Sequence, residues 1–205
     1  RAVLIEKRLI SEKFAAGQPQ RAAYISADLG ISILINEDDH LKIQVMTPGL
    51  SVAQAFRTAA KVAKALKELG YEVAMGREAV AEAAMMGRPS AEVLKAAQER
   101  AIEEGADPAL VAVMEGGFTG VVGTLRFEKP GPVVGLRFDM DSNDVQETDD
   151  PKHFPNREGF ASVHDGAMHA CGHDGHTTVG LALAKLFKQF EGQLCGTVKL
   201  VFQPA

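Results

Sequence analysis

A short stretch of the sequence concentrates side chains that commonly bind metal ions. Five of the six histidines lie within residues 153–176, and the densest part, residues 168–177, reads MHACGHDGHT. Cys171 and His173 stand two positions apart across a glycine, a residue that allows the backbone to bend. Because such a bend can direct a thiolate and an imidazole at one divalent ion, we expect Cys171 and His173 to be metal ligands.

Two aspartates precede this stretch. The apolar run PVVGLRF, residues 132–138, predicts a strand, and Asp139 and Asp141 follow at its carboxyl end. In open α/β sheets, ligands bind at that end of the strands. Side chains alternate along an extended chain, so both carboxylates are expected on one side. Each can either bind a metal ion directly or hold a ligating histidine through its second nitrogen.

Other polar residues surround the Cys-x-His pair. His169, Asp174 and His176 are predicted to lie around the ligands or against a substrate, although a histidine in a loop is often an ordinary surface residue. A helix beginning near His176 would present free N–H groups and the positive end of its dipole to the loop, which favours anionic ligands. The residues placed outside the site are His153 and His164, in a surface loop, and Cys195, as a small buried apolar side chain.

The segments that must position these residues alternate between helices and strands, as is typical of a layered α/β sheet domain. Ser51 is the predicted N-cap of a helix that ends at Gly70. Further helices are predicted over residues 77–104, interrupted at 87–89 and restarted by Ser90, then from Asp107-Pro108 onward, and over residues 176–190. Strands are predicted at residues 118–127, 132–141 and 196–204, with a turn at 129–131 and a polar loop over 142–168.

The residues before position 51 have a different pattern. Segments 21–26, 31–36 and 41–46 are rich in β-branched and aliphatic residues and are separated by polar segments, which predicts a small antiparallel meander. We therefore divide the chain into a β-rich segment, residues 1–50, and an α/β segment, residues 51–205.

The overall composition excludes several classes of partner. The chain has 205 residues, of which 46% are hydrophobic and 24% charged, and its apolar runs fall short of the ~20 residues that cross a bilayer. A formal net charge of -5 disfavours nucleic acid as a partner. With only two cysteines a disulfide framework is not expected, and a reducing cytoplasm is the expected location.

The motifs LRFDMDSND, GFASVHDGAMHACGHDGHT and GTVKLVFQPA resemble the metal-dependent aminoacyl amidohydrolases of the zinc peptidase family, which include indole-acetyl-amino-acid, hippurate and aminobenzoyl-glutamate hydrolases. The resemblance extends from about Phe56 to Ala205. It implies an incomplete zinc-exopeptidase-like α/β domain with two divalent ions, Zn, Mn or Co. It further implies hydrolysis of the amide of a small N-acyl or aminobenzoyl amino acid, and a homo- or hetero-oligomeric parent protein.

The resemblance also assigns roles to individual residues. Cys171 and His173 would bind metal, with His173 between the two ions, and Asp141 would have a catalytic role. The family's glutamate base follows a QPA sequence, which here is the last segment of the chain, so we expect a truncated fragment that is inactive alone. The sequence DMDSND departs from the family's usual DMDAL, which affects the local loop. The residues expected to support the ligands or the substrate are Asp139, His169, Asp174 and His176.

Residues 1–50 resemble a second, unrelated family, the bacterial protein arginine kinases, which are ATP:guanido phosphotransferases. The motif INEDDHLKIQ carries this resemblance and includes Glu37, Asp38, His40 and Lys42. The family has glutamate and arginine where Asp38 and Lys42 stand, so the base is displaced and a bidentate phosphate contact is lost. The chain is therefore predicted to be chimeric, with its junction between residues 49 and 56.

Two alternatives to an amidohydrolase fragment follow from these observations. One is a kinase-derived module that binds ATP. The other is a non-catalytic protein that holds a single structural metal ion through Cys171 and its neighbouring histidines.

Overall fold

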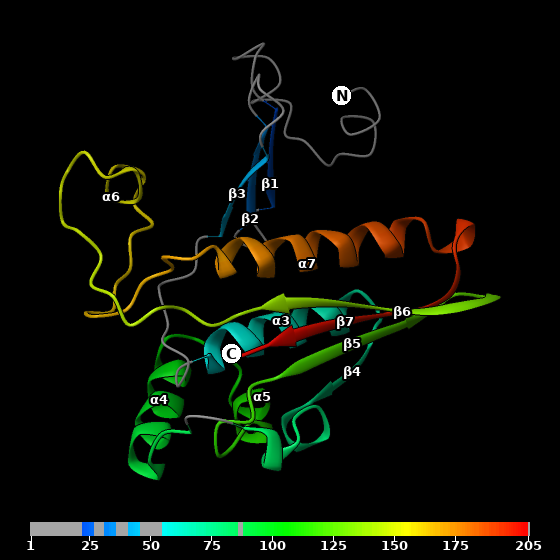
Figure 1. Ribbon diagram of the computed structural model, residues 1–205, viewed down its shortest axis with the longest axis horizontal. Helices are drawn as coiled ribbons and strands as arrows, with labels where there is room; N and C mark the ends of the chain where they lie inside the picture. The colour runs from blue at the N-terminus through cyan, green and yellow to red at the C-terminus, as the bar shows by residue number, and fades with distance from the viewer. Residues whose placement is uncertain (1–21, 27–30, 36–40, 46–54, 86–87, 205) are drawn as a thin grey trace. The chain divides into compact units, whose positions relative to one another are not determined.

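The computed structural model describes residues 22–26, 31–35, 41–45, 55–85 and 88–204 of the chain. The chain divides into two compact units, Arg1–Thr47 and Pro48–Ala205, which are considered separately (Figure 1). Among the described residues, no helix has the length and apolar character needed to span a membrane.

The described part of the first unit is a three-stranded meander. Strands β1 (Ala22–Ser26), β2 (Ile31–Ile35) and β3 (Leu41–Val45) pair as antiparallel neighbours in the order β1-β2-β3, which confirms the predicted arrangement. Of the kinase-like residues, Lys42 lies in β3 opposite Leu34, whereas Glu37, Asp38 and His40 lie outside the described residues.

A four-stranded sheet forms the centre of the second unit. Its strands are β4 (Glu72–Met75), β5 (Val121–Arg126), β6 (Lys129–Asp139) and β7 (Cys195–Gln203), in the order β4-β5-β7-β6. Strands β6 and β7 are parallel, and the other neighbours are antiparallel. The parallel pair requires a crossover, and the long helix between β6 and β7 supplies it.

The helices of this unit are α3 (Phe56–Glu68), α4 (Ala91–Glu103), α5 (Pro108–Val113), α6 (Phe154–Glu158) and α7 (His173–Gln189). Short 3-10 turns occur at Gly76–Glu78, Glu82–Ala84 and Glu191–Gln193. Helix α7 runs along the sheet beside β6 and β7 (Figure 1). The mixed α/β architecture around one open sheet agrees with the predicted fold class.

Helices α3 and α7 pack on the same face of this sheet. A Cβ added at Gly123 of β5 would lie 2.9 Å from Leu66 of α3, and one added at Gly180 of α7 would lie 2.6 Å from Phe202 of β7. Gly123 pairs with Leu200, two residues before Phe202, so these side chains point to the same side. Leu66, Leu200 and Phe202 are fully buried and form the core of the unit. The two glycines bring both helices close to the strands.

The buried hydroxyl of Tyr71 ties the end of α3 to α7, because it donates a hydrogen bond of 2.9 Å to the carbonyl oxygen of Ala184. Burial raises the pKa of Tyr71 above its usual value, and the nearby Glu191 adds to this effect. The phenol therefore remains a donor throughout the neutral range.

Several predicted element boundaries were wrong. Helix α3 begins at Phe56 with Ala55 at the N-cap position, and the predicted cap Ser51 lies outside the described residues. Between residues 77 and 85, where a helix was predicted, the structure has 3-10 turns at Gly76–Glu78 and Glu82–Ala84 and no α-helix. Strand β4 was not predicted. Gly76 explains why no α-helix forms between residues 77 and 85. It adopts a φ of 67° and closely approaches the backbone of Val113, and an α-helix cannot continue through a residue in this conformation.

Differences also occur around the second half of the sheet. The predicted turn at residues 129–131 is part of β6, which carries a register shift between Lys129 and Val133. Strand β7 lies between β5 and β6, so the two consecutive strands are not neighbours. The polar loop after β6 contains the short helix α6, and α7 begins at His173 rather than at His176.

The caps of α4 and α5 confirm their predictions and lead to a test. Asp107 Oδ1 accepts a hydrogen bond of 2.8 Å from the backbone N–H of Ala109, and Ser90 Oγ accepts one of 3.4 Å from that of Val93. We expect Asp107→Ala to lower the free energy of unfolding by about 1 kcal/mol, and Ser90→Ala by less because its hydrogen bond is longer. Urea unfolding followed by far-UV circular dichroism measures both, with Glu99→Ala as an exposed control. Equal effects in all three variants would contradict the capping roles.

Candidate metal centre

The carboxyl end of β6 supplies two buried aspartates. Asp139 is the last residue of β6 and pairs with Gln203 of β7, and the N–H of Met140 donates to the carbonyl oxygen of Gln203 at 2.9 Å. Asp139 and Asp141 are 9% and 8% exposed. The pairing of β6 with β7 therefore continues as far as Asp139. The two aspartates lie at the carboxyl end of the strand, as the sequence predicted.

The first turn of α7 supplies two histidines. Gly172 adopts a φ of 91° immediately before the helix, and its carbonyl oxygen accepts the N–H of His176 at 3.1 Å. His173 and His176 are three residues apart in this helix, which places their side chains on one face. Their rings stack with centroids 5.4 Å apart. Because α7 begins at His173, both imidazoles face the end of β6.

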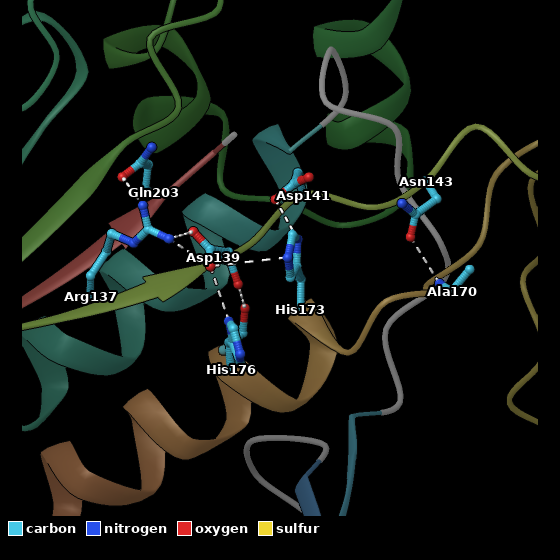
Figure 2. Close-up of polar contacts among 9 residues, drawn as sticks. Arg137, Asp139, Asp141, Asn143, Ala170, His173, His176 and Gln203 are labelled. Carbon is cyan, nitrogen blue, oxygen red and sulfur yellow. Dashed lines mark hydrogen bonds and ion pairs between the residues drawn. The ribbon is translucent and has the colours of Figure 1, made fainter.

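The aspartates and histidines contact each other in pairs (Figure 2). His173 Nδ1 lies 2.7 Å from Asp141 Oδ1, and His176 Nδ1 lies 3.1 Å from Asp139 Oδ2. His173 Nε2 lies 4.0 Å from Asp139 Oδ2. An ionised carboxylate only accepts hydrogen bonds, so His173 donates from Nδ1 to Asp141. In the neutral imidazole, Nε2 then carries the lone pair, on the side of Asp139.

Asp139, His173 and His176 can each offer one ligand atom, and these three atoms lie within 4.8 Å of one another. One carboxylate and two imidazoles form a donor set that Zn, Mn and Co accept. The contact between Asp141 and His173 has the form in which proteins orient a ligating histidine. These residues fit a divalent transition metal.

Arg137 and Thr177 hold Asp139 in place. The guanidinium of Arg137 lies 3.1 Å from Asp139 Oδ1 and 3.2 Å from Oδ2, and it also reaches Gln203 Oε1 at 3.5 Å (Figure 2). Thr177 Oγ1 donates to the carbonyl oxygen of Asp139 at 3.1 Å. Neither residue was predicted from the sequence. Arg137 lies two positions before Asp139, but no pattern in the chain indicated that its side chain would turn towards the site.

The remaining predicted site residues lie close to this group in sequence. Cys171 is exposed and is not one of the three residues that the geometry groups together, so its role as a ligand stays a prediction. His169 Nδ1 is buried and has no hydrogen-bond partner within the described part of the chain. Burial lowers the pKa of His169, and the nearby Asp174 opposes this shift. This shift favours the neutral form of the imidazole, which is the form that binds metals.

The loop between β6 and α7 is closed at its base beside the site. Asn143 and Met168 form an antiparallel bridge, and Asn143 Oδ1 accepts the N–H of Ala170 at 3.0 Å (Figure 2). Within the loop, the carboxylate of Glu147 contacts His153 Nε2 at 2.8 Å and accepts the backbone N–H of Ser162 at 2.5 Å. Glu147 thus connects two distant parts of the loop through its carboxylate.

Two residues that were predicted to lie outside the site are His164 and Cys195, and one of these two predictions is confirmed. His164 lies in the loop, as predicted, with its Nε2 3.1 Å from Glu104 Oε1. Cys195 was predicted to be buried, which was wrong. It is exposed at the first position of β7, where it pairs with Lys129 at the start of β6.

Comparison with known proteins relates the chain to two families. Residues 135–205 match the Peptidase family M20/M25/M40, and residues 1–74 match the ATP:guanido phosphotransferase C-terminal catalytic domain. Over 150 residues the chain is 53% identical to a p-aminobenzoyl-glutamate hydrolase subunit of Escherichia coli (strain K12), covering 73% of this chain and 34% of that protein. It is 51% identical over 150 residues to indole-3-acetyl-aspartic acid hydrolase of Enterobacter agglomerans, with the same two coverages of 73% and 34%.

A solved structure extends the comparison to the fold. The crystal structure of an aminobenzoyl-glutamate utilization protein from Klebsiella pneumoniae has a TM-score of 0.61 and 41% sequence identity, covering 77% of this chain and 33% of that chain. The chain therefore spans about a third of the length of the relatives it matches. The resemblance predicted from the motifs is confirmed, and it relates the α/β unit of this chain to the peptidase family M20/M25/M40 and its amidohydrolase members.

Proposed function

We propose that Asp139, His173 and His176 bind a divalent ion and that the protein carrying this site hydrolyses the amide of an N-acyl amino acid. The observation that carries the proposal is the convergence of these three side chains, from the end of β6 and the start of α7, within 4.8 Å. The similar proteins named for aminobenzoyl-glutamate and indole-acetyl-aspartate hydrolysis support this class of substrate. Since the chain spans 34% of those proteins, the activity is proposed for the whole protein that contains this segment.

Each residue has a distinct task in this proposal. Asp141 fixes the tautomer and orientation of His173 through the 2.7 Å contact to Nδ1, which leaves Nε2 available to a ligand. Asp139 offers a carboxylate oxygen to the same point, and Arg137 restrains that carboxylate from the side. When bound, a divalent ion supplies Lewis-acid chemistry, acidifying water and polarising an amide carbonyl.

The identity and number of the ions are part of the proposal. We propose Zn, Mn or Co, because imidazole and carboxylate oxygen suit these metals. We also propose a second ion, with the exposed Cys171 as an additional ligand. His173 would bind one of the two ions through Nε2, because its Nδ1 contacts Asp141. The relative from Escherichia coli is named as one subunit of a hydrolase, and on that basis we propose that the whole protein is oligomeric.

A binding experiment tests the proposal on the chain itself. Calorimetric titration with p-aminobenzoyl-glutamate is expected to show saturable binding in the presence of Zn²⁺, Mn²⁺ or Co²⁺ and to lose it after chelation. Release of aminobenzoate, followed by chromatography, shows whether the chain also completes the reaction. The proposed function is overturned if p-aminobenzoyl-glutamate binds equally well with and without each of these ions. It is also overturned if the Asp139→Asn variant binds the compound with unchanged affinity.

The match of residues 1–74 to the guanidino phosphotransferases favours one alternative, a module that binds ATP. That function predicts a rise in the thermal unfolding midpoint with Mg-ATP and no response to p-aminobenzoyl-glutamate. Lys42→Ala is the matched variant, since it removes a cationic side chain of the kinase-like motif and leaves the metal-site residues intact. A Mg-ATP effect that disappears in Lys42→Ala would establish the alternative.

A further inference from the structure

A pocket lies in the α/β unit, away from the residues of the metal site. It has a volume of about 870 Å³ and is formed by the turn after β4, the start of α4 and the end of α5. None of its lining residues belongs to the group Asp139, His173 and His176. A volume in this range is that of pockets that hold small molecules.

Two guanidinium groups line this pocket and are held by the same neighbours. Arg77 Nη1 lies 2.6 Å from Glu82 Oε2, and Arg88 Nη1 lies 2.9 Å from Glu82 Oε1. Both groups also lie over the ring of the fully buried Phe118, at 4.0 Å and 5.3 Å from its centroid. An aromatic face and a shared carboxylate therefore hold two long side chains together.

The backbone makes room for this arrangement at Gly116. This residue has a φ of 83°, and a Cβ added to it would lie 2.6 Å from Arg88 Nη2. A side chain at this position would displace the guanidinium from Phe118. The conformation and the space at Gly116 both favour glycine.

The carboxylate of Glu82 does not match the charge and the hydrogen-bond donors of Arg77 and Arg88. Two guanidiniums carry ten N–H donors and two positive charges, and one carboxylate cannot satisfy or neutralise both. Lys95 also lines the pocket but is paired with Glu99 at 3.9 Å, and Glu115 lies in the lining as well. Arg77 is 62% and Arg88 36% exposed, so both remain open to a ligand that enters from solvent. The two guanidiniums therefore keep N–H donors for an anionic ligand.

The rest of the lining selects a ligand with an apolar part. Leu94, Ala112 and Val113 contribute apolar side chains beside the guanidiniums, and 51% of Val113 is exposed. Guanidinium donors match the oxygens of carboxylates and phosphates. We propose that this pocket is a binding site for a small organic oxyanion, whose carboxylate or phosphate group contacts Arg77 and Arg88 and whose apolar body lies against α4 and α5.

Calorimetric titration of the full chain with phenyl phosphate, benzoate and inorganic phosphate tests this proposal. Phenyl phosphate or benzoate is expected to bind saturably, and tighter binding of one identifies the head group as phosphate or carboxylate. Inorganic phosphate is expected to bind more weakly than phenyl phosphate because it does not use the apolar wall. Binding is expected to persist after chelation of metal ions and in His173→Ala, which separates this site from the proposed metal centre.

Two variants move the affinity in opposite directions. Arg88→Gln is expected to weaken binding about tenfold through the loss of a charge-assisted contact. Glu82→Gln is expected to strengthen binding several-fold, because it frees both guanidiniums from their carboxylate. Arg126→Gln, which removes the exposed partner of Glu72, is the matched control and is expected to leave affinity unchanged. Weaker binding in Glu82→Gln, or no saturable binding of any of the three probes, overturns the proposal.

Discussion

Asparagine in place of Asp139 is expected to lower the affinity of the chain for Zn²⁺ by at least about 100-fold. The change keeps the size of the side chain and removes the negative charge that converges with His173 and His176. It also removes the ion pair with Arg137, whose guanidinium would then point a positive charge at the site. Both effects act against a cation, because an amide oxygen is a weaker ligand than a carboxylate.

Asp141→Asn is the informative companion of this variant. Asp141 acts through His173 rather than on the ion, so its replacement is expected to weaken Zn²⁺ binding by about 10- to 100-fold. Competition with a fluorescent zinc chelator at constant pH gives both affinities, and Asp165→Asn serves as an exposed control. An affinity for Zn²⁺ in Asp139→Asn equal to that of the unmodified chain would remove Asp139 from the ligand set.

Alanine in place of Phe202 is expected to lower the free energy of unfolding of the α/β unit by about 3–5 kcal/mol. Phe202 is fully buried in the interior strand β7, and its ring lies 5.2 Å from that of Phe138 in β6. Gly180 of α7 approaches so closely that a Cβ there would lie 2.6 Å from the Phe202 ring. The contact is with the ring itself, and Gly180 has no side chain that could fill the space left when the ring is removed. The cavity would therefore remain.

Urea unfolding measures this loss. The chain contains no tryptophan, so far-UV circular dichroism is the appropriate signal. Val133→Ala is the control, since Val133 lies in the neighbouring strand with 68% of its surface exposed and is expected to change stability by no more than about 0.5 kcal/mol. Phe202→Ala also removes packing one residue before Gln203, the partner of Asp139, so Zn²⁺ affinity is expected to fall with stability. A change below about 1 kcal/mol would show that Phe202 is not central to the core.

Local chemistry explains what the sequence predicted correctly. Asp107-Pro108 and Ser90 marked helix starts, because capping depends on a side chain and the N–H groups two or three residues later. The apolar run before Asp139 marked a strand, because β-branched and aliphatic residues favour an extended backbone over a few consecutive positions. The His-rich motif indicated the resemblance to the peptidase family M20/M25/M40, which the match of residues 135–205 confirms, and with it the kind of fold.

Tertiary structure alone decided how these parts meet. The partners of His173 and His176 are 32 and 37 residues away in sequence, and they meet only because α7 crosses back over the sheet and places β7 beside β6. Strands β5 and β6 follow each other in the sequence, but β7 lies between them in the sheet. The chain reaches this position through α7, because a strand parallel to β6 can be added only after a crossover. The residues of the motif therefore set the chemistry available at the site, whereas the long-range strand pairing determined which carboxylate reached which imidazole.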